Sequence, residues 1–275
     1  MPHADLHLHT NFSDGTLTPV ELVREIALKG IEVISVSDHD IVDGLPAATR
    51  EAKRHKIRVI PGVELSSAME GKEVHVLGLF IDPEHRELSK RLSEFRGERL
   101  RRGKLMVERL KKLGLHIDYD ELAASVVDGG SLGRPHIARK LMEAGYVTSI
   151  PDAFDRYLGM GRPGYVGKAV LSPAQAIDLV HTVGGLAFLA HPGALRRDDM
   201  VPKLFRAGLD GIEAYHSDHD AKTALHYRSM AERFGKLVSG GSDFHGENKG
   251  HAPLGSGGLM REDYERLLAA AGAET

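Results

Sequence analysis

The feature of this chain that most limits its possible folds is a series of short apolar runs that end in histidine or aspartate. Four of them precede His7-Leu8-His9, Asp38-His39-Asp40, His191-Pro192 and Asp243-Phe244-His245. Short apolar runs rich in valine and isoleucine are typical of buried strands. Imidazole and carboxylate are side chains that bind divalent transition metals. The pattern therefore predicts a parallel sheet or barrel that gathers its strand ends around a metal cluster.

The order of apolar runs predicts an α/β fold. Strands are expected at Ala4–Leu8, Glu32–Ser37, Ile57–Pro61, Glu73–Phe80, Gly185–Ala190, Gly211–Tyr215 and Lys236–Gly240. Helices are expected between most of them, at Thr18–Lys29, Leu45–His55, Pro173–Val183, Val201–Ala207 and Ala221–Phe234. The first helix carries the clearest signal, because Thr18 and Glu21 have the spacing of a capping box. Strands that alternate with helices over short links indicate a parallel sheet, and seven such strands indicate a closed or nearly closed barrel.

Composition narrows the class of protein. The chain has 275 residues, which suits a single α/β barrel, and 41% of them are hydrophobic. A net charge of −3 argues against a protein that coats long nucleic acid, which needs a basic surface. Since there is no cysteine, a metal site must use nitrogen and oxygen ligands. With no signal segment and no membrane-spanning apolar run in the sequence, we expect a cytoplasmic protein without a membrane partner.

Metal-competent side chains occur at or near every expected strand end, where such barrels build their active sites. They are His7, His9, Asp38, His39, Glu64, His75, His191, His216, Asp243 and His245. His75 is the exception in position, because it falls early in its strand. A single histidine of this kind is more often a hydrogen-bonded core residue, but the coincidence of so many predicts a metal site.

The motifs together resemble one family. They are Asp-Leu-His-Leu-His-Thr from Asp5, Phe12-Ser13-Asp14-Gly15, Ser37-Asp38-His39-Asp40, Gly62-Val63-Glu64, Val74-His75, Ala190-His191-Pro192-Gly193 and Ser242-Asp243-Phe244-His245. In this order the set is similar to the PHP (polymerase and histidinol phosphatase) family. The resemblance implies a distorted (β/α)7 barrel that holds two to three divalent metal ions. It also implies nine ligands, namely His7, His9, Asp14, His39, Glu64, His75, His191, Asp243 and His245.

The resemblance further implies how the ligands divide. One ion would be held by His7, His9, Glu64 and Asp243, a second by Glu64, His75 and His191, and a third by Asp14, His39 and His245. Glu64 would bridge two ions, and the family's chemistry would use a metal-bound hydroxide. Nitrogen and oxygen ligands suit Mn, Fe or Zn alike. Asp38 and Asp40 flank a ligand, so we expect them either to orient metal ligands or to act as turn and cap residues.

The interval from Asp82 to Lys168 breaks the alternation and reads as a helical insertion. We therefore predict a barrel formed by residues 1–82 and 169–275 with residues 83–168 as a cap. A long helix is expected over Glu84–Leu113, and Arg99 and Arg102 fall on its face at positions where the spacing would place apolar residues. Their side chains either extend to the surface or bind phosphate. Arg134 and His136 stand at the start of a later helix, a position that suits anions. Lys168 ends a glycine-rich segment. We expect these five residues to bind substrate phosphate.

The combined prediction is a metal-dependent phosphoesterase. The cap is similar to that of PHP enzymes acting on nucleoside 3′,5′-bisphosphates or short 5′-phosphorylated RNA, so a phosphorylated small molecule or short oligonucleotide is the expected substrate. His216, at a strand end, is the candidate that protonates the leaving oxygen. A histidinol-phosphate phosphatase, a metal-dependent amidohydrolase and a non-catalytic, polymerase-associated module remain as alternatives. The amidohydrolase lacks support because no strand-end lysine is present to bridge two metals.

Overall fold

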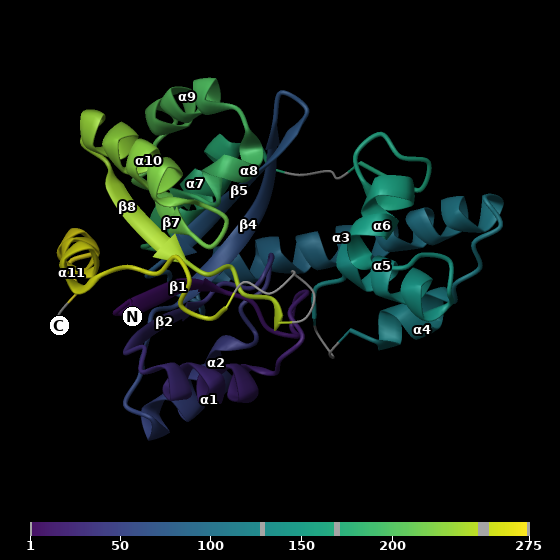
Figure 1. Ribbon diagram of the computed structural model, residues 1–275, viewed down its shortest axis with the longest axis horizontal. Coiled ribbons are helices and arrows are strands. Elements are labelled where there is room, and N and C mark those ends of the chain that lie inside the picture. Colours follow the sequence, from purple (N-terminus) through teal and green to yellow (C-terminus); the bar gives the residue numbers. More distant parts are fainter. Residues whose placement is uncertain (1, 127–129, 168–170, 247–252, 274–275) are drawn as a thin grey trace.

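The computed structural model describes residues 2–126, 130–167, 171–246 and 253–273. Figure 1 shows two parts: a body of strands surrounded by helices, and a group of helices, α3 to α6, extending from one side of it. Both ends of the chain lie on the body, away from the α3–α6 group. Within the described residues, no helix combines the length and apolarity needed to cross a membrane.

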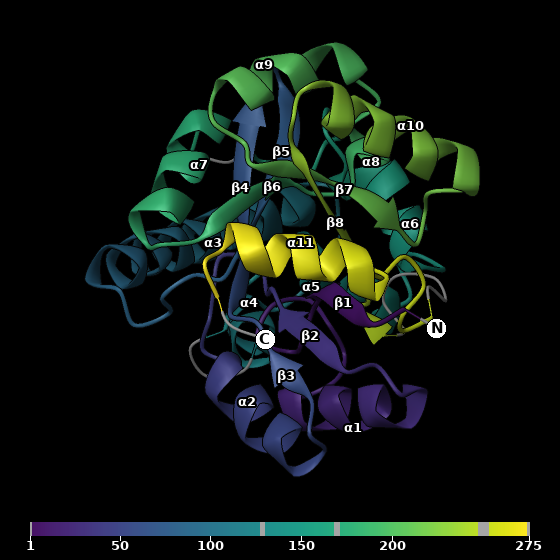
Figure 2. The ribbon, with the colours of Figure 1, turned by 90° about the vertical axis from the view of Figure 1, so that its left-hand side faces the viewer.

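The first sheet of the body is parallel and follows the prediction closely. Its strands are β1 (Ala4–Leu8), β2 (Val33–Val36) and β3 (Arg58–Val59), in that order. Between β1 and β2 runs α1 (Pro19–Lys29), which has the predicted capping box of Thr18 and Glu21 and ends at Gly30 in the left-handed conformation. Between β2 and β3 runs α2 (Leu45–Arg54). In Figure 2 both helices lie together on one side of this sheet.

The second sheet has the order β4-β5-β6-β7-β8 and is mixed, so the prediction of an all-parallel sheet was wrong here. Its strands are β4 (Gly62–Met69), β5 (Lys72–Leu79), β6 (Leu186–Leu189), β7 (Gly211–His216) and β8 (Leu237–Gly241). Strand β5 is antiparallel to both β4 and β6. A tight turn at Glu70 and Gly71, both with positive φ, joins β4 to β5 as a hairpin.

The hairpin explains the unexpected position of His75. Because β5 runs in the opposite direction, its beginning lies beside the carboxyl end of β6, and the Ala190 N–H donates to the His75 carbonyl. His75 therefore reaches the same end of the sheet as His191 although it is early in its own strand. The sequence also placed Glu64 at the end of a third strand, but β3 stops at Val59 and Glu64 lies near the start of β4. Pro61 separates the two strands, since its nitrogen carries no hydrogen to donate.

Isolated bridges connect the two sheets. His39 pairs with Glu64, and Leu8 pairs with Phe244, in each case in parallel. Ala4 also pairs with Leu259. The sheets thus meet at the two places where predicted metal ligands are found. Helices pack outside the second sheet: α7 (Pro173–Thr182), α8 (Pro192–Leu195), the 3-10 turn η2 (Asp198–Met200), α9 (Val201–Arg206), α10 (Ala221–Arg233) and α11 (Arg261–Ala270).

The insertion has a hydrophobic cluster of its own. Its elements are α3 (Arg86–Lys112), α4 (Tyr119–Ala124), α5 (Arg134–Glu143), α6 (Ile150–Ala153) and the π-helix η1 (Phe154–Leu158). Leu88 and Leu92, at the start of α3, pack into the core of the body, whereas Met106 and Leu110 belong to the cluster inside the insertion. One uninterrupted helix, α3, therefore connects the two parts. Gly103 does not break it; a Cβ there would come 2.5 Å from Leu132, so glycine permits close packing.

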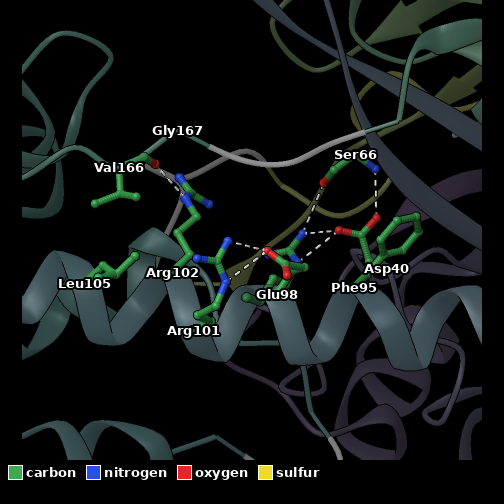
Figure 3. Close-up of a pocket in the computed structure, with 10 residues that line it drawn as sticks. Asp40, Ser66, Phe95, Glu98, Arg101, Arg102, Leu105, Val166 and Gly167 are labelled. Carbon is green, nitrogen blue, oxygen red and sulfur yellow. Dashed lines mark hydrogen bonds and ion pairs between the residues drawn. The ribbon is translucent and has the colours of Figure 1, made fainter.

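An ion pair fixes α3 to the strand ends. Arg99 and Asp40 are both buried, and the Arg99 Nε donates to Asp40 Oδ2 at 2.9 Å. The Arg99 guanidinium also donates to the Ser66 hydroxyl at 3.1 Å. Figure 3 shows Asp40 and Ser66 facing α3, with the Ser66 N–H donating to the Asp40 carboxylate. Asp40 follows the metal-ligand candidate His39, so this contact ties the insertion to the predicted site.

Removing the charge of Asp40 should destabilise the protein strongly. Asp40→Asn keeps the shape and tolerates the positive φ of this position, but leaves Arg99 as a buried, unpaired cation. We expect a loss of about 3–5 kcal/mol in the free energy of unfolding, measured by urea denaturation. Glu98→Gln is the control, because Glu98 pairs with Arg101 on the exposed face of the same helix and should change stability by less than about 0.5 kcal/mol. Equal effects of both variants would contradict the assignment.

Candidate metal centre

The predicted ligands converge at one end of the two sheets. His7 lies in β1 and His9 directly after it, and because strand side chains alternate, both point to the same side. Among the described residues, three groups of side chains have ligand atoms within 4.8 Å of one another: His9, Asp14, His39 and His245; His7, His9, Glu64 and Asp243; and His39, Glu64 and His75. The first two groups contain two of the expected sets, whereas the third has His39 where His191 was expected; His9, His39 and Glu64 each belong to two groups.

Glu64 stands at the middle of the cluster. Its Oε1 lies 2.8 Å from the Nδ1 of His75 and 2.9 Å from the Nε2 of His191. Its Oε2 lies 2.9 Å from the Nδ1 of His39, and 3.2 Å and 3.3 Å from the Nε2 atoms of His9 and His7. The two oxygens of one carboxylate thus face two different sets of imidazoles. This is the arrangement expected of a carboxylate shared between two cations.

The electrostatics of the cluster favour cations. Although burial alone raises the pKa of Glu64, the imidazoles of His39, His75 and His7 hold it well below its usual range. Burial likewise lowers the pKa of His7, but the carboxylates of Glu213 and Glu64 outweigh it and raise the pKa to about 10. By contrast, burial and the neighbouring imidazole of His245 lower the pKa of His9 to about 4, so the imidazoles around Glu64 do not all carry a proton.

The donor set fits metal ions. Nε2 of His7, Nε2 of His9, Nδ1 of His39 and Oε2 of Glu64 are buried and make no hydrogen bond within the described ranges. Buried polar atoms rarely lack a hydrogen bond, and these four point toward one another. The nine predicted ligands comprise six imidazoles and three carboxylates, a set suited to Mn, Fe or Zn. The side chains can therefore hold divalent metal ions.

Glu213, which was missed in the sequence, contacts two of the predicted ligands. Its side chain is fully buried, with Oε1 2.9 Å from His7 Nδ1 and Oε2 accepting from the His191 backbone N–H at 2.7 Å. A carboxylate that holds the far nitrogen of a ligating histidine fixes the ring and its tautomer. The available signal was a glutamate inside the apolar strand β7, where a charge is unexpected unless it is paired.

Two further aspartates build the scaffold. Asp5, also missed, is fully buried and accepts from the Ser242 N–H, the Ser242 hydroxyl and the Gly255 N–H, which fixes the segment before Asp243. Asp38 accepts from Thr10 and Ser13 in the loop after β1. Asp38 thus organises the loop that carries Asp14, whereas Asp40 binds Arg99. The hydrogen bonds found for Asp38 and Asp40 therefore hold the loop after β1 and helix α3 in place.

Strained backbone occurs at two of the predicted ligands. His191 and Asp243 have φ values of 28° and 50°, in the left-handed region that favours glycine. Such residues persist only where the surrounding structure holds them, and they concentrate at functional sites. The bond from the His191 N–H to Glu213 is one such constraint.

His216 lies at the end of β7, buried next to the cluster. Its Nδ1 accepts from the Asp218 N–H at 3.0 Å, so the proton of the neutral ring is on Nε2. That nitrogen lies 3.4 Å from Asp243 Oδ2. His216 is therefore placed to hold a proton beside a predicted metal ligand.

A cleft of about 320 Å³ opens over the cluster. The body contributes ligand candidates, Ala194, His216 and Asp218 to its lining, and the insertion contributes Pro135, Ile150 and Phe154. We call these last three residues the apolar wall. A phosphate ester bound at the cluster would extend between the body and the insertion.

The four described residues expected to bind phosphate each have a partner within the protein. Arg99 pairs with Asp40, Arg134 pairs with Glu73 at 2.6 Å, Arg102 donates to the Val166 carbonyl, and the His136 Nδ1 accepts from the Gly133 N–H. Figure 3 shows Arg102 directed at the 166–167 segment. None of the four is among the residues that line the cleft in the described structure, so their contact with phosphate stays a prediction. Lys168 lies outside the described residues.

Comparisons with known proteins agree with this site. The PHP domain family matches residues 5–157. A 5′-3′ exoribonuclease of Salmonella typhimurium is 35% identical over 88% of this chain and 84% of its own length. A 3′,5′-nucleoside bisphosphate phosphatase of Chromobacterium violaceum is 34% identical over 93% of this chain and 91% of its own length. A crystal structure from Bifidobacterium adolescentis, provisionally described as a metal-dependent phosphoesterase, superimposes with a TM-score of 0.89 at 32% identity, covering 98% of this chain and 96% of that chain.

Glu64→Gln should remove bound metal. The amide keeps the shape but loses the charge that faces both sets of imidazoles, so we expect metal affinity to fall by at least about 100-fold. The measurement is metal content per chain after dialysis, by plasma mass spectrometry. Glu70→Gln is the matched control, because Glu70 forms exposed ion pairs with Arg197 and Lys203. A Glu64→Gln protein with wild-type metal content would refute the central position of this carboxylate.

Proposed function

This chain belongs to the PHP domain family, and on that premise we propose that it is a metal-dependent phosphoesterase that removes the 3′-phosphate of nucleoside 3′,5′-bisphosphates or cleaves short 5′-phosphorylated RNA. The observation that carries the proposal is the position of Glu64, whose two oxygens face separate sets of imidazoles beneath an open cleft. The names of two relatives, each about a third identical over most of both chains, support the substrate class.

We propose that two to three ions occupy the cluster, in the three groups described above. The ions, when bound, polarise phosphoryl oxygens and lower the pKa of water. Glu64 would hold two of them at a fixed separation, and Glu213 would keep His7 and His191 in the ligating orientation. A phosphate group would sit on the cluster side of the cleft, where the positive charge of the ions exceeds the negative charge of the three carboxylates.

The remaining architecture fits the same proposal. The two sheets, joined by the bridges at His39–Glu64 and Leu8–Phe244, would act as a distorted (β/α)7 barrel formed by residues 1–82 and 169–275. Residues 83–168 would form the cap, held at Asp40 by Arg99. His216 would supply a proton from Nε2 to the leaving oxygen. Arg134 would reach a second phosphate only by leaving its ion pair with Glu73.

Activity on a panel of substrates distinguishes the proposed enzyme from a histidinol-phosphate phosphatase, an amidohydrolase and a non-catalytic module. We expect kcat/KM for adenosine 3′,5′-bisphosphate or a short 5′-phosphorylated oligonucleotide to exceed that for histidinol phosphate by at least about tenfold, or about 1.4 kcal/mol. The measurement is phosphate or nucleotide release by metal-loaded protein. Better turnover of histidinol phosphate, hydrolysis of amides alone, or no turnover at all would each replace the proposal with the corresponding alternative.

His216→Asn should slow esters according to their leaving group. If Nε2 of His216 protonates the leaving oxygen, alkyl phosphates should lose about 100-fold or more in kcat, whereas p-nitrophenyl phosphate, whose leaving group needs little protonation, should change little. Metal content is measured in parallel. An equal loss for both esters, with less metal bound, would instead assign His216 to holding Asp243, its neighbour at 3.4 Å.

A further inference from the structure

The apolar wall of the cleft has no role in metal binding or phosphate chemistry. Pro135 lies in the first turn of α5, Ile150 begins α6, and Phe154 begins the π-helix η1. All three come from the insertion, and they line a cleft to which the body contributes mainly histidine and carboxylate side chains. We propose that this wall is a platform for the nucleobase of the substrate and that Phe154 is its stacking residue. This inference rests on the proposed function.

Phe154 is positioned as a platform should be. Its side chain is only partly buried, so part of the ring remains accessible in the cleft. The Arg134 guanidinium lies 5.3 Å from the ring centroid and 5.7 Å from that of Tyr165. Arg134 is in turn held by Glu73 of β5, the strand that carries His75. The ring is thus connected, through one ion pair, to the strand that supplies a metal ligand.

The local backbone supports this placement. Phe154 is at the start of a π-helical turn, and its carbonyl accepts from the Gly159 N–H at 2.8 Å. A Cβ at Gly159 would come 2.7 Å from that carbonyl oxygen, so glycine is required for the turn to close. π-Helical turns are rare and occur often at functional sites. Here the turn begins at the residue that faces the cleft.

The chemistry of the wall selects its occupant. A phosphate held at the cluster leaves the rest of the substrate to extend along the cleft, toward the insertion. Phe154, Pro135 and Ile150 offer apolar surface and no side-chain hydrogen-bonding group. A sugar hydroxyl or a further phosphate gains nothing there, whereas any base can stack on the ring. The wall should therefore favour nucleotides over base-free sugar phosphates while discriminating little among the bases.

The test compares two substrates that differ only in the base. Adenosine 3′,5′-bisphosphate has both phosphates and adenine, and 1-deoxyribose 3,5-bisphosphate has both phosphates and no base. Phe154→Ala should lower kcat/KM for the nucleotide by about 5- to 150-fold, the usual range for loss of base stacking, and by less than about threefold for the base-free compound. Wild-type protein should treat the adenine, guanine and uracil bisphosphates alike within about tenfold.

Two further variants distinguish a loss of base stacking from a loss of folding. Phe154→Leu retains apolar bulk without the aromatic face, so it should fold even if the alanine variant does not, and should still lose part of the preference for the nucleotide. Phe234→Ala is the control, because Phe234 is an exposed phenylalanine outside the cleft, and it should leave both substrates unchanged. Equal losses on both substrates in the Phe154 variants would overturn the platform and assign Phe154 to the fold of the insertion.

Failure of the proposed function gives a different result. Wild-type protein would then turn over neither compound. Equilibrium titration of the protein with adenosine 3′,5′-bisphosphate and with 1-deoxyribose 3,5-bisphosphate would still test whether Phe154 binds the base. The platform predicts that adenine strengthens binding by about 5- to 150-fold in wild-type protein and by less than about threefold in Phe154→Ala. Equal affinities of the two compounds for wild-type protein would overturn it.

Discussion

The structure depends on one carboxylate held among imidazoles. Glu64 is fully buried at the start of β4, and five histidines from four strands or their ends lie within 3.3 Å of its two oxygens. So many polar groups cannot be buried together without compensating charge, because burial disfavours an unpaired carboxylate and an unpaired imidazolium alike. Metal cations at this position would neutralise the carboxylate and would bind the imidazoles in their neutral form. The bridges that join the two sheets, the buried Glu213 and the strained turn at His191 all serve to hold this arrangement.

The insertion completes the site from the other side. Arg99, paired with Asp40, joins α3 to the residue after His39, and Arg134, paired with Glu73, joins the start of α5 to the strand of His75. Two arginines expected to meet substrate thus hold the insertion against the strands. Their ion pairs bring Pro135, Ile150 and Phe154 to the cleft. In the proposed function, the body would supply the metal ligands, and the insertion would supply the surface that distinguishes one phosphate ester from another.

The sequence predicted most strands, because short apolar runs are a local signal, and the side chains proposed as metal ligands from the motifs do converge at one end of the two sheets. It failed where the answer depends on pairing between distant segments. The antiparallel direction of β5 follows from the hairpin at Glu70 and Gly71, and only that direction explains His75. Glu213 and Asp5 could be noticed as charges within apolar strands, but their partners, His7 and Ser242, lie more than 200 residues away. The partners of Arg99 and Arg134 could not be predicted either, since helical spacing shows which face of a helix is buried and not which residues pack against it.

The most direct test of this account is anomalous X-ray scattering from crystals of the metal-loaded protein. The account predicts at least two ions about 3.5–4 Å apart, with the two oxygens of Glu64 bound to different ions. The nitrogen atoms of His7 and His9 should bind the first ion, and those of His75 and His191 the second. A single ion that does not touch Glu64, or ions bound elsewhere while His75 and His191 keep their hydrogen bonds to the Glu64 carboxylate, would contradict it.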